Sequence, residues 1–245
     1  MQTQFLCDQY LARIQGDTQH RLSPVERFDI YQSFGPTNCS NDHSEQMRLL
    51  ETNQLQFSIA DLAFAWLTWL TAKKLVPIWK EHGFEEYKFD EECCNNPFIM
   101  LEETENVLLG KHTPSEAFCT LNVVFHQDLA TLEMNFTEKM CYAIVCAYES
   151  LELTLFGRNS LQKTDMFETA DEAVNKRNLD FARLAVKAYT SIDDNEPGVW
   201  GDTTFSDVPY KPLVYLVEKR LEFWEWWLTE AIPQAWQLAQ ETPKL

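Results

Sequence analysis

The chain has 245 residues, of which 45% are hydrophobic and 13% aromatic, so it can bury a core without disulfides or a metal. Its 38 acidic residues outnumber its 20 basic ones, which gives a formal net charge of −18. Because a surface of that sign repels nucleic-acid phosphates and anionic membranes, we expect neither as a partner, and any charged partner should be basic.

Glycine is scarce, at 7 of 245 residues, compared with about 7% in an average protein. Hairpins and barrel corners need glycine at positive φ, whereas helices need it only at their ends. The composition therefore predicts an all-α fold with little or no β-sheet. We expect one domain over 1–245, with 1–22 peripheral. The N-terminus has no basic segment and no long apolar one, so we expect no secretory signal and a cytoplasmic location.

Several helix starts carry a capping hydroxyl, a proline and a glutamate. Ser23-Pro24-Val25-Glu26 and Thr113-Pro114-Ser115-Glu116 both place these residues where orphan N–H groups need acceptors, and Ser58 and Asp61 repeat the spacing. Four glycines follow apolar-periodic stretches, where helices commonly end: Gly35, Gly83, Gly110 and Gly157. Together these signals predict about seven helices packed as one array or bundle, near 24–34, 59–82, 97–109, 114–130, 136–156, 170–190 and 211–240.

The segment from Ile59 to Leu70 is apolar on nearly every helical face, so its helix should be central and buried. The most hydrophobic stretch, 62–72, has eleven residues, and a membrane span needs about 20. We therefore expect no membrane segment. The longest irregular stretches should be the polar region 35–50 and the segment 191–210, which is rich in Gly, Pro and Asp.

The usual catalytic and metal-binding motifs are missing. The seven cysteines include no C-x-x-C pair, and we expect them to be buried free thiols. No phosphate-binding glycine loop, nucleophile elbow or H-E-x-x-H sequence occurs. His126 and Asp128 are spaced so that one could orient the other, but a single such pair carries little information. We therefore expect that the protein is not an enzyme and that it binds no metal and no cofactor. A cryptic metal-dependent hydrolase is the alternative left open.

The central run 73–110 contains the junction Leu75-Val76-Pro77-Ile78-Trp79, a short acidic loop after it, and a helix from Pro97 that ends in Leu108-Leu109-Gly110. In these features it resembles the immunity proteins of bacterial polymorphic toxin systems, and most closely the family usually numbered fifth among them. The helix 139–157 and the aromatic-rich helix Lys219–Pro233 fit more loosely.

This resemblance implies a helical, non-catalytic protein that binds and neutralises a cognate toxin domain. Many such toxins are nucleases and therefore basic, and a chain of charge −18 would attract them. The alternative from another class is an α-helical scaffold or a homodimer that associates through its tryptophan-rich helix.

The last predicted helix contains a stretch of thirteen residues that holds four of the eight tryptophans. Its apolar stripe is expected to consist of Leu213, Val217, Leu221, Trp224, Leu228 and Ala231. Trp224 is then a core residue, and Trp227 lies at the edge of the stripe beside Arg220, where a guanidinium could stack on the indole. Trp226 faces the opposite way with Tyr215, so either another helix of the chain covers it or it contacts a partner.

Two acidic segments are further candidates for contact with a basic partner. The first is the expected loop 85–92, with aromatic residues among its carboxylates: Glu85, Glu86, Asp90, Glu91 and Glu92. The second lies in the irregular segment after 190 and consists of Asp193, Asp194, Trp200 and Asp202. For the loop 85–92, a solvated connector is the alternative to an interface.

Overall fold

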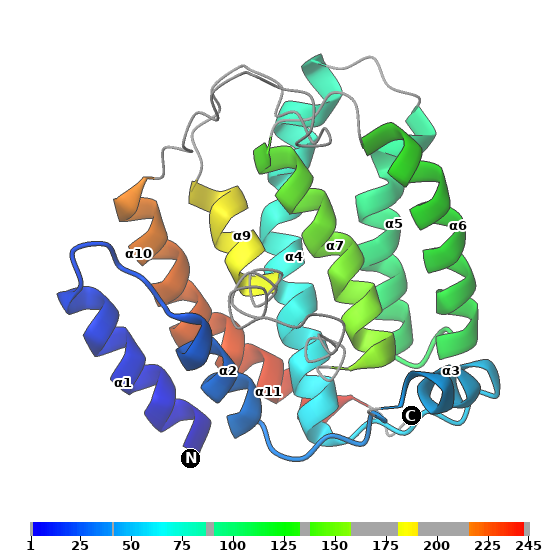
Figure 1. Ribbon diagram of the computed structural model, residues 1–245, viewed down its shortest axis with the longest axis horizontal. Coiled ribbons are helices and arrows are strands. Elements are labelled where there is room, and N and C mark those ends of the chain that lie inside the picture. The colour runs from blue at the N-terminus through cyan, green and yellow to red at the C-terminus, as the bar shows by residue number, and fades with distance from the viewer. Residues whose placement is uncertain are drawn as a thin grey trace, which may run out of the picture.

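A computed structural model describes residues 2–40, 42–86, 91–132, 138–157, 181–190 and 216–242, and it describes the backbone alone for 82–86, 91–94, 125–132 and 138–141. Helices account for nearly all of these residues (Figure 1). They are α1 (Gln2–Gly16), α2 (Pro24–Ser33), α3 (His43–Glu51), α4 (Ile59–Glu86), α5 (Glu91–Leu108), α6 (Pro114–Leu132), α7 (Glu138–Phe156), α9 (Phe181–Thr190), α10 (Val217–Trp226), the π-helical turn η3 (Trp227–Ala231) and α11 (Ile232–Glu241). No strand occurs in the described ranges, which confirms the all-α class.

The predicted capping boxes form as the sequence indicates. Ser23 Oγ accepts a hydrogen bond from the N–H of Glu26, and Glu26 Oε2 accepts one from the N–H of Ser23 at 2.7 Å. The same reciprocal pair joins Thr113 and Glu116 at the start of α6. These contacts are local in sequence, so nearby residues are enough to predict them.

Several predicted helix boundaries are wrong. Gly83 lies inside α4, which runs on to Glu86, because a glycine permits a helix end without requiring one. α5 begins at Glu91, so Pro97 lies inside the helix and Asn96 is a buried helical residue. α1 and α3 were not predicted. α3 buries only Gln46 and Leu50, a pattern too sparse to read as an amphipathic helix.

α4 is the central helix, as its uniformly apolar sequence predicts. Every residue from Ala60 to Ala72 is buried, and α4 packs against α5, α7, α9 and α11. In Figure 1, α7, α5 and α6 extend from α4 on one side, and α9, α10 and α1 lie on the other. α3 lies at the lower end of α6. No helix among the described residues is long and apolar enough to cross a membrane.

The tryptophan-rich helix contains a π turn that the sequence analysis did not predict. The N–H of Ile232 donates to the oxygen of Trp227, five residues back. Pro233 has no N–H to donate, and its ring would clash with the carbonyl of Thr229 in a regular helix, so the wider turn relieves both problems. The described core includes every fourth residue of this helix: Phe223, Trp227, Ala231, Ala235 and Ala239. In a regular α-helix, side chains four residues apart differ in direction by about 40°, so such a series would turn away from the core. The wider π turn offsets part of this rotation.

Trp227 is therefore a core residue, and its predicted position at the edge of the stripe is wrong. It is fully buried, and its ring packs near those of Tyr31, Phe181 and Trp224. Its Nε1 donates to Thr71 Oγ1 of α4 at 3.2 Å. Trp224 is buried as predicted. Arg220 donates to the main-chain oxygen of Gln19.

Candidate functional site

The described residues show no arrangement suited to metal chemistry. Among them, no group of three or more His, Cys, Asp or Glu side chains is placed so that it could hold a metal ion. Cys7, Cys39 and Cys146 are buried, and burial raises the pKa of the Cys7 thiol to about 12, so this thiol is protonated at neutral pH. Cys119 is exposed. The side chain of His126 lies outside the described residues.

The acidic segment 85–92 is not the loop that we predicted. Glu85 and Glu86 are the last residues of α4, and Glu91 and Glu92 are the first residues of α5. Asp90 lies outside the described residues. The connection is shorter than expected because α4 continues through Gly83 and α5 starts before Pro97. Four of the five acidic residues thus belong to the end of α4 or the start of α5.

The second acidic segment lies wholly outside the described residues, so its role stays a prediction. It comprises Asp193, Asp194, Trp200 and Asp202, and the same holds for Tyr215.

Trp226 is half-buried and makes its described contacts within its own chain. The ammonium of Lys74, on α4, lies 4.4 Å from the centroid of the Trp226 ring, and the buried Phe223 ring lies 5.7 Å away. Another helix of the chain therefore covers part of this indole, which was one of the two predicted outcomes. Contact between Trp226 and a partner stays a prediction.

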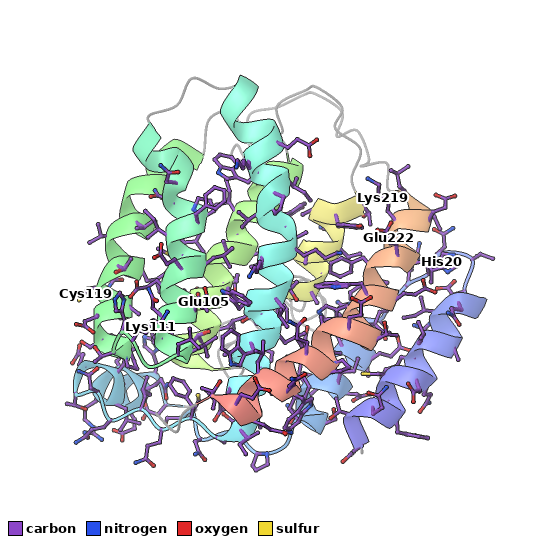
Figure 2. All side chains as sticks on the ribbon, turned by 180° about the vertical axis from the view of Figure 1, so that it is seen from behind. His20, Glu105, Lys111, Cys119, Lys219 and Glu222 are labelled. Carbon is purple, nitrogen blue, oxygen red and sulfur yellow. The ribbon has the colours of Figure 1, made fainter. Side chains whose placement is uncertain are left out.

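Lys74 also lies between two aromatic residues. Its ammonium is 5.3 Å from the ring centroid of Tyr189, on α9, in addition to its contact with Trp226. The hydroxyl of Tyr189 donates to Glu222 of α10. Burial and this carboxylate raise the pKa of Tyr189 to about 12, so the phenol stays neutral. Figure 2 shows Lys219 and Glu222 of α10 on one side of the molecule and Glu105, Lys111 and Cys119 on the opposite side.

An ion pair closes the turn between α5 and α6. Glu103 is largely buried, and its Oε1 lies 2.8 Å from Nδ1 of the half-exposed His112. The Glu103 carboxylate raises the pKa of His112, first through this hydrogen bond and then through its charge. The pair links α5 to the connection that leads into α6.

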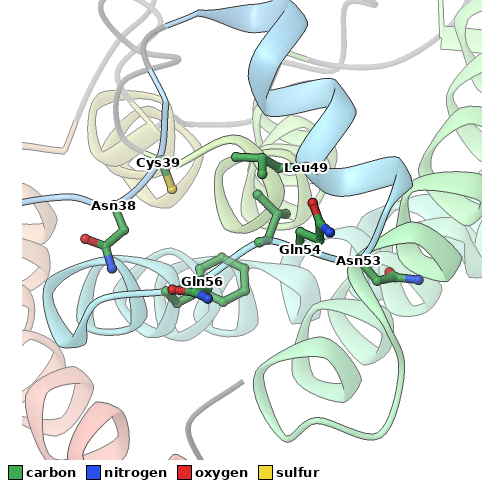
Figure 3. A pocket seen from close by; sticks show the side chains of 8 residues that line it. Asn38, Cys39, Leu49, Asn53, Gln54 and Gln56 are labelled. Carbon is green, nitrogen blue, oxygen red and sulfur yellow. The ribbon is translucent and has the colours of Figure 1, made fainter.

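A pocket that the sequence did not suggest opens between α3 and the start of α4. It has a volume of about 770 Å3 and is lined by Asn38, Cys39, Leu49, Asn53, Gln54, Leu55, Gln56 and Phe57. Figure 3 shows Asn38, Cys39 and Gln56 at one end of the pocket in that view, and Asn53 and Gln54 at the other. Half of the lining residues carry side-chain amides, and none of them is charged. Periodicity gave no sign of this pocket because it lies in the polar region 35–50 and the connection after it.

Comparison with known proteins gives one family. The model of the family described as immunity protein Imm5 matches residues 8–234. No curated protein and no solved structure matches the chain. The family match covers most of the chain, including the segment that forms the pocket and the tryptophan-rich helix up to residue 234. The protein therefore belongs to the Imm5 immunity protein family.

Proposed function

We propose that this protein is a non-catalytic immunity protein that binds a cognate toxin domain in the cytoplasm and neutralises it. The observation that carries the proposal is the Imm5 match over residues 8–234. An inhibitor of this kind works in a fixed ratio to its toxin and needs no reaction of its own.

The net charge of −18 supports a basic toxin, such as a nuclease, as the partner. Opposite charges speed the encounter of two proteins, and salt screens this attraction over about 10 Å at 0.1 M ionic strength. The rate of association should therefore fall as salt is added. An association rate that does not change with salt would contradict the basic character of the toxin without affecting inhibition itself.

The proposed contact residues are those that combine carboxylates with aromatic rings. They are Glu85, Glu86, Asp90, Glu91 and Glu92 at the α4–α5 connection, Asp193, Asp194, Trp200 and Asp202, and Tyr215 with Trp226. Two glutamates end α4 and two begin α5, so these acidic residues are concentrated in a short part of the chain, which would attract a basic partner.

The direct test is co-expression of this chain with the toxin domain encoded beside its gene. We expect the cells to survive and the two proteins to elute together as a complex in gel filtration. A toxin domain of unrelated sequence serves as the control, and neither effect is expected with it. If the adjacent toxin domain kills the cells and forms no complex, the proposal fails. If the chain elutes alone as a dimer, the homodimer alternative gains support.

The contact residues can be tested with two variants of equal charge. In the first, Glu85, Glu86, Glu91 and Glu92 are changed to Gln. In the second, the same change is made at four exposed glutamates elsewhere: Glu51, Glu102, Glu218 and Glu230. The first variant should bind the toxin domain more weakly than the second. Equal affinity would show that net charge matters and that the α4–α5 carboxylates have no special role.

A further inference from the structure

The pocket between α3 and α4 is held open mainly by hydrogen bonds to Asp61 and Gln46, two buried residues that do not line it. The buried carboxylate of Asp61, at the start of α4, accepts from the N–H of Asn38 and from the N–H of Ser58, both at 2.9 Å. It also accepts from the hydroxyl of Thr37. Asp61 thus ties both chain segments that flank the pocket to one helix end, so the pocket exists before any ligand arrives.

The α3 side of the pocket is fixed in the same way. The buried amide of Gln46 accepts from the N–H of Ser40 and donates to the main-chain oxygen of Leu155, both at 2.9 Å. Asn53 Oδ1 accepts from the N–H of Ser115, at the start of α6. These bonds join α3 and the connection after it to α6 and α7.

The pocket retains hydrogen-bonding groups that the fold does not use. Within the described residues, the main-chain N–H and C=O groups of Leu55, Gln56 and Phe57 have no hydrogen-bond partner. The exposed side-chain amides of Asn38 and Gln56 likewise have none in the described part of the chain. Each amide offers two donors and one acceptor. The result is an irregular segment with free main-chain groups beside two free amides.

The chemistry of the lining selects one class of ligand. A bound cation would find no carboxylate among the eight lining residues, and a phosphate would find no lysine or arginine there. Neutral amides and main-chain groups pair best with the neutral main chain of a peptide, and Leu49, Leu55 and Phe57 offer apolar contacts for its side chains. The volume lies within the roughly 300–1,000 Å3 typical of ligand pockets.

We propose that this pocket binds a peptide segment of the partner in an extended conformation. The segment pairs its main chain with Leu55, Gln56 and Phe57 and with the amides of Asn38 and Gln56. This inference rests on the proposed function, because the segment belongs to the toxin domain. The hydrogen bonds of the pocket are neutral and directional, and they add to the electrostatic attraction between the two proteins. Charge speeds the encounter, and the pocket fixes the orientation of the toxin domain.

The test compares two double variants in complex with an inactivated form of the toxin domain encoded beside the gene. Asn38→Ala with Gln56→Ala removes the free amides. Gln9→Ala with Gln234→Ala removes two exposed glutamine amides that do not line the pocket and have no hydrogen bond among the described residues. The first variant should raise the Kd of the complex by about tenfold to a hundredfold, and the second should leave it unchanged. Both should unfold at the temperature of the wild type, because no intramolecular bond is lost.

Amide hydrogen exchange of the wild-type complex tests the main-chain contacts separately. Exchange at Leu55, Gln56 and Phe57 should slow by about tenfold or more when the toxin domain binds. If the Asn38→Ala, Gln56→Ala variant binds as tightly as the wild type, or if exchange at these three residues is unchanged, the pocket proposal is overturned and the immunity function stands. If the wild type forms no complex with the toxin domain, the proposed function falls and the pocket proposal falls with it.

Discussion

The tryptophan-rich C-terminal helix and the segment 36–58 are both anchored on α4, but different forces hold them. The helix buries Phe223, Trp224 and Trp227 against α4 and its neighbours, with one indole hydrogen bond to Thr71. The segment 36–58 depends instead on a few buried polar groups, chiefly Asp61 and Gln46. Apolar packing spreads its stabilisation over many contacts, whereas the polar anchor concentrates it in single side chains. Substitutions should therefore act differently in the two regions.

The largest effect is expected in the apolar region. Trp227→Ala should lower the free energy of unfolding by about 4 kcal/mol, because a fully buried indole leaves a cavity. Its half-buried neighbour is the control, and Trp226→Ala should cost about 1 kcal/mol. Urea denaturation followed by circular dichroism measures both. Equal losses would show that Trp226 is as much a core residue as Trp227 and would remove it from the proposed contact surface.

The next largest effect should come from the polar anchor. Asp61→Ala removes the acceptor for Thr37, Asn38 and Ser58 and half of the capping box of α4. We expect a loss of about 2 kcal/mol, since three partly buried or exposed donors lose their acceptor and the α4 cap is lost. Glu51→Ala, which removes an exposed carboxylate from nearby α3, should change stability by less than about 0.5 kcal/mol. A loss below about 1 kcal/mol for Asp61→Ala would mean that water replaces the carboxylate and that the pocket is less rigid than we infer.

A glycine at the contact between the segment and α7 gives a third test. Gly157 has φ +69°, and an added Cβ would lie 2.4 Å from Cys39 Sγ. Gly157→Ala should therefore cost about 2 kcal/mol, through the left-handed backbone and the displacement of Cys39. Gly16→Ala is the matched control, since a Cβ there meets nothing within 4 Å, and it should be neutral or slightly stabilising. Thermal unfolding of both variants distinguishes these outcomes.

The smallest effect should be the pH dependence of the α5–α6 turn. Because the pKa of His112 is raised in the folded protein, its pairing with Glu103 stabilises the fold fully at pH values below the unfolded pKa. That contribution is lost as the pH rises through the folded pKa. The stability difference between the wild type and His112→Ala should thus be larger at about pH 5.5 than at about pH 8. If the difference is the same at both pH values, the contact is a neutral hydrogen bond.

Parts of both regions could be predicted from local sequence. The box formed by Ser58 and Asp61 was expected from its spacing, and Asp61 does accept from the N–H of Ser58. Trp224 was expected in the core because it belongs to an apolar stripe of helical period, and it is buried. The second role of Asp61, which holds Thr37 and Asn38, could not be foreseen. Those residues lie more than twenty positions away and carry no pattern that points to it.

The sequence by itself determined the helical class, the capped starts of α2, α4 and α6, and the central place of α4, because each depends on residues within a few turns of one another. The tertiary structure alone decided which polar groups distant in the sequence meet. Gln46 reaches Leu155 across 109 positions, and Trp227 reaches Thr71 across 156. It also decided, through the π turn before Pro233, that Trp227 faces the core and Trp226 lies beneath Lys74. The helical period determines how side chains are arranged around one helix axis. Which of those side chains are buried depends on the neighbouring helices, and these are set only in the folded chain.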